Sequence, residues 1–139
     1  MTLLSFIKEN EVEYADNRIR EQDIAVFEKA VGVKFGKELC EYLLKYGYLA
    51  FGFSELYGVT AGQMLESDIV KETQYIHKYY PITSALIAIE DQGEGDYYVV
   101  DSKDQMYEFD SELETLTELH MTLFEYILSR FSSIKELLE

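Results

Sequence analysis

The sequence is poor in several residue types that usually accompany catalysis or nucleic-acid binding. It contains no tryptophan, one cysteine, one proline and 12 basic residues against 27 acidic ones. The single cysteine, Cys40, excludes an internal disulfide and agrees with a reducing compartment. The net charge of −15 disfavours nucleic acid and anionic membranes as ligands, because binding to a duplex requires cationic groups that displace counterions.

Motifs of the common catalytic chemistries are also missing. The chain has no Gly-x-Ser-x-Gly, no phosphate-binding Gly-x-x-x-x-Gly-Lys-Ser/Thr and no dinucleotide fingerprint. His77 and His120 have no second histidine or cysteine at metal-ligand spacing, so we interpret each as a packed or solvated side chain. Cys40 lacks an electropositive neighbourhood and is expected to be a core or boundary thiol. We therefore expect no catalytic residue, no metal and no cofactor.

Two uses of the many carboxylates were weighed against simple binding. The acidic segment 91–96 does not have the spacing of an EF-hand, which requires acids at alternating positions and a later bidentate glutamate. A glycosidase requires two carboxyl groups across a sugar cleft, and with so many acids a close pair is expected by chance. The absence of tryptophan further weakens the sugar-binding hypothesis.

Length and composition predict one domain over residues 1–139. At 139 residues and 47% hydrophobic, the chain can bury roughly two-thirds of its unfolded surface. Pro81 is the only proline and no Ser/Gly-rich linker occurs. The N-terminal residues have no basic leader and no long apolar run, so we expect a cytoplasmic protein with no membrane segment. The oligomeric state stays open.

Residues 24–47 predict two consecutive helices joined by a tight turn. Ile24, Phe27 and Val31 recur with the period of one helix face, and Gly32 stands where a helix commonly ends in the left-handed conformation. The second helix, with apolar residues at the same spacing from Leu39 to Tyr46, is expected to end at Gly47.

The remaining patterns predict a mostly antiparallel sheet flanked by helices, an α+β fold. Residues 86–89 are apolar on both faces and suit a central strand, whereas residues 106–110 alternate and suit an edge strand. Short connections between the strands favour hairpins. Helical spacing predicts a helix that starts at Ser67 or Asp68 and stops before Pro81, and a last helix capped by Thr122.

The negative charge is concentrated in the predicted sheet. Between residues 90 and 118, eleven acidic residues face one base, Lys103. Such a field speeds encounter with a basic partner, although a solvated acidic surface that aids solubility has the same composition. Twelve tyrosines are more than a small core can hide, so some of them reach the surface as interface or boundary residues. We place the expected partner-binding contacts at Glu90, Asp91, Glu94, Asp96, Tyr97 and Tyr98.

The order of these motifs resembles the SUKH superfamily, the SMI/KNR-like immunity protein domain, over roughly residues 20 to 131. Two positions depart from the family pattern: Phe35 and Gly36 stand in place of Leu-Pro, and Tyr48 replaces part of an Asn-Gly pair. The matching positions are Phe27, Glu28, Val31 and Gly32 in the first helix; Leu39, Tyr42, Leu43, Tyr46 and Gly47 in the second; Phe51, Gly52, Leu56, Tyr57 and Gly58 after it; and residues 96–101, 106–110 and 123–127 downstream.

This resemblance implies a function that the residue patterns alone do not. Members of the superfamily commonly serve as immunity proteins that neutralise toxin domains, often nucleases, delivered by neighbouring bacteria. The chain is accordingly expected to be a non-enzymatic protein that binds a basic toxin domain. The alternative is an intracellular regulatory or scaffold domain, as the fungal cell-wall regulators of the superfamily suggest. The family-like residues Glu28 and Asp101 are expected to be local hydrogen-bond acceptors.

Overall fold

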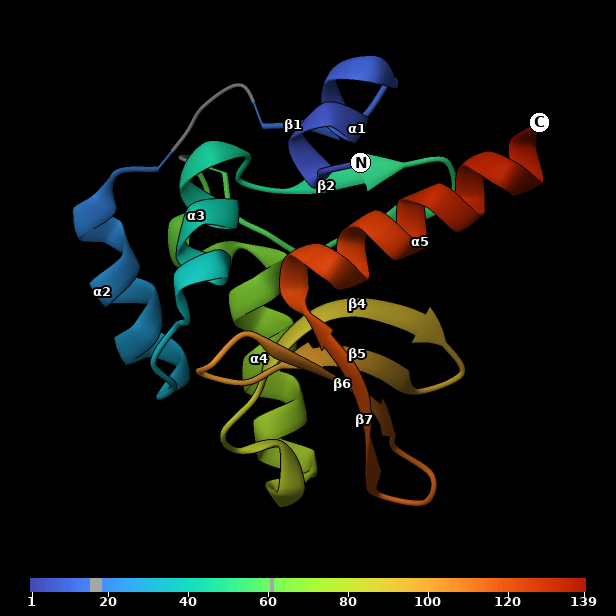
Figure 1. Ribbon diagram of the computed structural model, residues 1–139. Coiled ribbons are helices and arrows are strands. Elements are labelled where there is room, and N and C mark those ends of the chain that lie inside the picture. The colour runs from blue at the N-terminus through green and yellow to red at the C-terminus, as the bar shows by residue number, and fades with distance from the viewer. Residues whose placement is uncertain (16–18, 61) are drawn as a thin grey trace.

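A computed structural model describes residues 1–15, 19–60 and 62–139 (Figure 1). These residues form an α+β fold with helices around two antiparallel sheets, as the sequence predicts. The elements are α1 (Leu3–Glu9), β1 (Glu13–Tyr14), α2 (Glu21–Val31), α3 (Lys37–Lys45), β2 (Leu49–Phe51), β3 (Ser54–Glu55), η1 (Met64–Glu66), α4 (Asp68–Tyr79), η2 (Pro81–Thr83), β4 (Ile87–Gly93), β5 (Asp96–Val100), β6 (Gln105–Asp110), β7 (Thr115–Thr122) and α5 (Leu123–Leu138).

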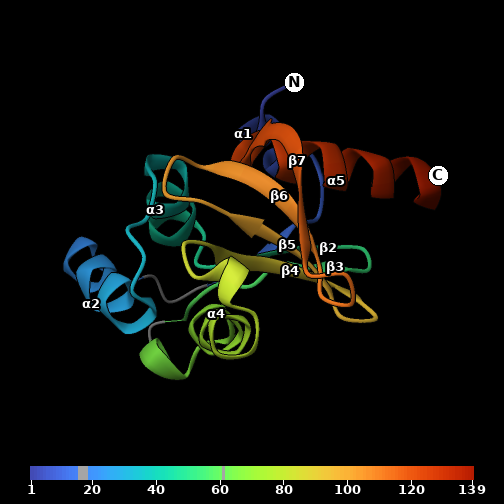
Figure 2. The same ribbon diagram turned by 90° about the horizontal axis from the view of Figure 1, so that it is seen from below.

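The larger sheet, in the order β4-β5-β6-β7, lies between two helical layers. Figure 2 shows α4 on one face, and α5 together with α1 on the other. Successive strand residues point to opposite faces, so Val99 and Phe109 pack with Ile76 of α4. Val100 contributes to the second core, together with Phe131 of α5. Strands β4, β5 and β6 therefore contribute buried residues to both faces of the sheet, which explains the two-sided apolar strands.

The predicted helix ends are confirmed. Gly32 ends α2 with a φ of 73°, and Gly47 follows α3 with the same φ, in the left-handed region that glycine adopts without strain. The Thr122 hydroxyl accepts a hydrogen bond from the Glu125 amide and caps α5. Pro81 follows the end of α4 and begins a 3₁₀ turn.

Two strand assignments from the sequence are wrong. The strand containing residues 86–89 is an edge strand, because β4 pairs only with β5 within its sheet. Its outer side is covered by the segment after β3, where the Tyr57 amide donates to the Ile89 carbonyl at 2.7 Å. The strand at residues 106–110 is internal, because β7 pairs along its other side. No pattern in the sequence predicted α1, β1 or β7.

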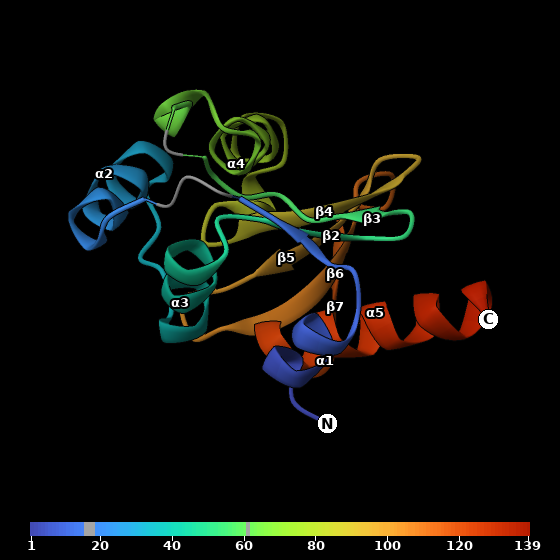
Figure 3. The same ribbon diagram turned by 90° about the horizontal axis from the view of Figure 1, so that it is seen from above.

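The smaller sheet lies beside the edge of the larger one at β4. Its order is β1-β2-β3, and Figure 3 shows β2 and β3 running beside β4. Gly58 allows the close approach of two backbones, since a Cβ atom there would lie 2.0 Å from the Gly47 carbonyl oxygen. Among the helices that the structure describes, none is long and apolar enough to cross a membrane.

Candidate partner-binding surface

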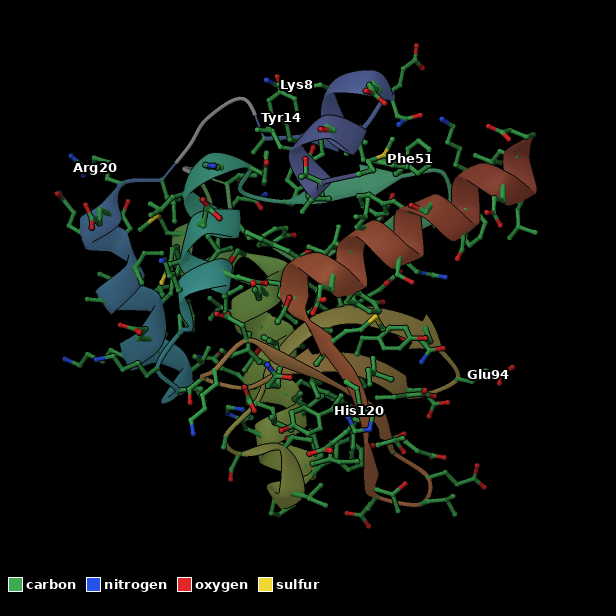
Figure 4. All side chains as sticks on the ribbon, viewed as in Figure 1. Lys8, Tyr14, Arg20, Phe51, Glu94 and His120 are labelled. Carbon is green, nitrogen blue, oxygen red and sulfur yellow. The ribbon has the colours of Figure 1, made fainter. Side chains whose placement is uncertain are left out.

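Three hairpin turns lie along one side of the molecule. They connect β2 to β3, β4 to β5 and β6 to β7, and they stay on the same side in all three ribbon views (Figures 1, 2 and 3). The residues at their tips are exposed, and Figure 4 shows the Glu94 side chain directed away from the rest of the molecule. We call this side the turn face and define it by the exposed residues Phe53, Asp91, Glu94, Glu112, Leu113 and Glu114.

Close packing fixes two of these turns to one another. Gly93, Glu94 and Gly95 take φ values of 86°, 56° and 84°, so the β4–β5 turn is built from left-handed residues. A Cβ atom on Gly95 would lie 2.5 Å from the Ser111 hydroxyl in the β6–β7 turn. Glu94 carries a side chain in a conformation that most residues avoid, and this places its carboxylate at the tip of the hairpin.

Like charges face one another where these two hairpins join. Asp96 is paired directly with Asp110 across β5 and β6, an arrangement that destabilises a sheet. No lysine or arginine within the described ranges forms an ion pair with either carboxylate. Asp110 Oδ1 instead accepts hydrogen bonds from the amides of Glu112 and Leu113. The turn face therefore keeps uncompensated negative charge.

Glu90 does not lie on this face. Its residue exposure is only 2%, and a bulge between Ala88 and Glu90 places it opposite Tyr98, on the face covered by α5. The carboxylate receives hydrogen bonds from Ser54 Oγ at 2.7 Å and Tyr126 Oη at 2.5 Å, and it pairs with Arg130 at 3.1 Å. The expectation that Glu90 meets a partner at the surface does not fit this burial.

The other expected contacts divide between the turn and the two sheet faces. Asp91, Glu94 and Asp96 are brought together by the β4–β5 hairpin. Tyr97 points to the α4 side and is buried, and burial together with nearby Glu72 raises its pKa to about 12. Tyr98 points to the α5 side, where its ring lies 4.8 Å from that of Tyr126. Only the three carboxylates form one surface group.

Two apolar residues of the turn face were missed by the sequence analysis. Phe53 is 62% exposed in the β2–β3 turn, and Leu113 is 69% exposed in the β6–β7 turn. Large exposed apolar side chains within a polar surface are typical anchors of protein interfaces. A signal was present for Leu113, which stands alone between Glu112 and Glu114, whereas Phe53 was hidden in an apolar and aromatic stretch.

The groups capable of covalent or metal chemistry are engaged or isolated. His77 Nε2 is 2.7 Å from the Leu86 carbonyl oxygen, and His120 is exposed. Burial, with Glu28 and Asp104 nearby, raises the pKa of the Cys40 thiol and disfavours its reactive thiolate. Within residues 1–15, 19–60 and 62–139, no group of three or more His, Cys, Asp or Glu side chains is placed to hold a metal ion. His77 is thus a packed side chain, His120 a solvated one and Cys40 a partly buried thiol.

The two family-like acids also behave as expected. Glu28 Oε2 accepts the Phe35 amide at 2.7 Å and closes the connection between α2 and α3. Asp101 Oδ1 accepts the amides of Lys103 and Gln105, and Asp101 Oδ2 accepts the Tyr107 hydroxyl. Both residues therefore organise turns.

The pattern of these features also occurs in a known domain family. They are the two turn-forming acids, the two helices followed by glycine and the sheet after them. The sequence pattern of SUKH_5, described as SMI1-KNR4 cell-wall, matches residues 2–132. The chain belongs to the SUKH_5 family. The SUKH family is known for immunity proteins of polymorphic toxin systems. A search of curated proteins finds no match.

Proposed function

We propose that this SUKH domain is a cytoplasmic immunity protein that binds and neutralises a basic toxin domain of the nuclease type without any turnover of its own. Family membership supports the immunity role. The single observation that supports a basic partner is the uncompensated charge of the turn face, which combines the exposed carboxylates Asp91, Glu94, Glu112 and Glu114 with the exposed apolar side chains of Phe53 and Leu113. Nucleic acid and membranes are not its partners, because the same charge repels both.

Charge and apolar anchors have separate tasks in this proposal. A field of one sign accelerates encounter with a surface of opposite sign, and it mainly affects the association rate. Lifetime of the complex depends on a few anchors that lose water on binding. Leu113 is suited to be such an anchor, because it lies between two carboxylates and is 69% exposed. An enzyme surface that binds phosphate groups offers the positive charge that these carboxylates require.

The family description also supports a second candidate, a regulatory or scaffold domain of cell-wall biology. Both candidates act by binding, so the partner distinguishes them. A neighbouring gene for a secreted protein with a toxic C-terminal domain indicates immunity, whereas a solitary gene among cell-wall genes indicates regulation.

The test is co-expression with the toxin domain encoded beside the gene, followed by kinetics with the purified proteins. We expect the wild-type chain to restore growth and to co-purify with the toxin domain. Neutralising two carboxylates of the β4–β5 hairpin in Glu94→Gln/Asp96→Asn should slow association at low salt by on the order of tenfold. Failure of the wild-type chain to bind or protect would reject the proposed function.

A matched control separates local from global charge. Gln22→Lys/Ala25→Lys changes the net charge by the same amount, but on exposed positions of α2. This helix lies on the opposite side of the molecule from the three turns (Figure 1). If both double variants slow association equally, the hairpin is not the contact surface.

A further inference from the structure

A groove opens between the β2–β3 turn and the β4–β5 hairpin. Its volume is about 530 Å³, within the usual range of ligand-binding clefts. Phe53, Glu55 and Tyr57 line one side, Asp91 lines the other, and Glu90 and Arg130 form part of its lining from the α5 side. The three carboxylates outnumber the one guanidinium, so the groove has a net negative charge.

The arginine in the groove is already neutralised. Arg130 Nη2 lies 3.1 Å from Glu90 Oε2, and Arg130 Nε donates to the same carboxylate. The guanidinium also lies 5.5 Å from the centre of the Phe53 ring. The side chain of Arg130 is only 28% exposed, so the groove is not a free anion site.

The outer carboxylates have no such partner. Within the described residues, no lysine or arginine forms an ion pair with Glu55 or Asp91. Asp91 uses Oδ1 to accept the Gly93 amide at 2.6 Å, which leaves Oδ2 available. Both residues are exposed, and both therefore offer acceptor oxygens at the mouth of the groove.

The aromatic residues at the groove point to a protein ligand. Phe53 is 62% exposed although it is a large apolar side chain. Tyr57 is partly buried, and burial raises the pKa of its hydroxyl, which remains a neutral donor. An aromatic face beside carboxylates suits a planar cation, because the ring attracts the guanidinium and the carboxylates accept its fork of donors.

We propose that the groove receives an arginine side chain of a basic protein partner, with Phe53 against the guanidinium and Glu55 and Asp91 as its acceptors. The identity of that partner as a toxin domain rests on the proposed function. Arginine suits the groove better than lysine, since its planar guanidinium stacks on a ring and presents five donors in a fixed geometry, whereas the ammonium of lysine is a compact and strongly hydrated point charge.

The test uses the blocked peptide Ac-Gly-Arg-Gly-NH2 and its citrulline counterpart, which has nearly the same shape and no charge. In ¹H–¹⁵N NMR titrations of the full chain, we expect saturable shifts of the Phe53, Glu55 and Gly93 amides with the arginine peptide alone. Glu55→Gln/Asp91→Asn and Phe53→Ala should each weaken binding by about fivefold or more. The matched controls Glu9→Gln/Glu11→Gln and Leu4→Ala replace exposed residues outside both the groove and the turn face, and they should leave binding within about twofold.

Three outcomes would overturn the inference: equal shifts with citrulline, no shifts at these amides, or equal weakening by the groove and control variants. The peptide titration can be carried out without a toxin. If the chain protects against its toxin but the peptide does not bind at the groove, the immunity function is supported and the arginine site is rejected. If the peptide binds as expected and no toxin is neutralised, the arginine site is supported and the immunity function is rejected.

Discussion

Asp104 caps the N-terminus of α3 through the amide of Leu39, although the two residues are 65 positions apart in the chain. Its other carboxylate oxygen accepts the Glu38 amide at 2.8 Å. Gly36, at the N-cap position itself, has no side chain to do this, and a Cβ atom there would lie 2.4 Å from Asp104 Oδ1. The turn between β5 and β6 is thereby fixed to the N-terminus of α3.

Loss of this cap should destabilise the whole domain. Asp104→Ala removes both acceptors and leaves two buried or part-buried amides unsatisfied, which we expect to lower the free energy of unfolding by about 2 kcal/mol. Asp104→Asn keeps one acceptor and tolerates the φ of 64°, so its loss should be smaller. Urea unfolding followed by circular dichroism measures both, and an Asp104→Ala variant as stable as the wild type would disprove the cap.

Glu90 should act through folding and not through partner contact. Glu90→Ala leaves Arg130, Ser54 and Tyr126 without their shared acceptor, and we expect a loss of about 2–4 kcal/mol. Association with a basic partner should change little in Glu90→Leu/Arg130→Met, which removes Glu90 together with the guanidinium that it neutralises, because residue 90 is only 2% exposed. Urea unfolding of Glu90→Ala and stopped-flow binding of the double variant test the two statements.

A double-variant cycle isolates the ion pair within that cluster. Glu90→Leu/Arg130→Met removes both charges and fills similar volume, so it should recover part of the stability lost by either single change. Additive losses in the double variant would show that the two side chains do not stabilise one another.

The crossing of two backbones at Gly58 should tolerate no side chain. In Gly58→Ala the new methyl group meets the Gly47 carbonyl oxygen and the Tyr48 backbone, neither of which can rotate away. We expect a loss of more than about 2 kcal/mol by thermal or urea unfolding. Gly62→Ala is the control, since no atom lies within 4 Å of its added methyl group, and it should stay within about 0.5 kcal/mol of the wild type.

The helix ends could be predicted from the sequence because residues next to them in the chain determine them. Gly32 and Gly47 end their helices because only glycine enters the left-handed region freely, and Thr122 carries its cap within its own turn. Residues 106–110 were wrongly assigned to an edge strand because β7 has no buried residue and therefore gives little apolar signal. No local pattern announces Tyr57 covering the edge of β4 either.

In the candidate site, too, the residues of one hairpin could be predicted from the sequence, whereas those placed by tertiary structure could not. Asp91, Glu94 and Asp96 were predicted together because one short hairpin carries them. Glu90 was assigned to the surface because it stands beside them in an acidic run, and only the bulge after Ala88 turns it inward. Phe53 joins the site through tertiary packing of the β2–β3 turn, which the sequence does not specify locally.

Glu72 links the negative charge of the β4–β5 hairpin to the stability of the fold. It lies on α4, and its pKa is raised above 4.5 by burial first and then by Asp91 and Asp68. A carboxyl group whose pKa is raised in the folded state stabilises the fold when it is protonated. Its contribution to the free energy of unfolding is therefore fully present below pH 4.5 and is lost as the pH rises through the raised pKa. Glutamine cannot lose that proton, and Glu72→Gln should therefore gain stability relative to the wild type over this interval.

Urea unfolding at a series of pH values from about 4 to about 7 measures the difference between the two proteins. We expect the difference to grow with pH and then to become constant, because ionisation of Glu72 is complete above its folded-state pKa. Glu66→Gln is the control for the loss of a carboxyl group as such, since Glu66 is exposed and pairs with Lys71. A difference that is flat with pH, or that shrinks, would show that Asp91 and the buried surroundings do not penalise the charge of Glu72. The rise would show that the fold penalises the charge of Glu72, through burial first and then through the neighbouring carboxylates Asp91 and Asp68.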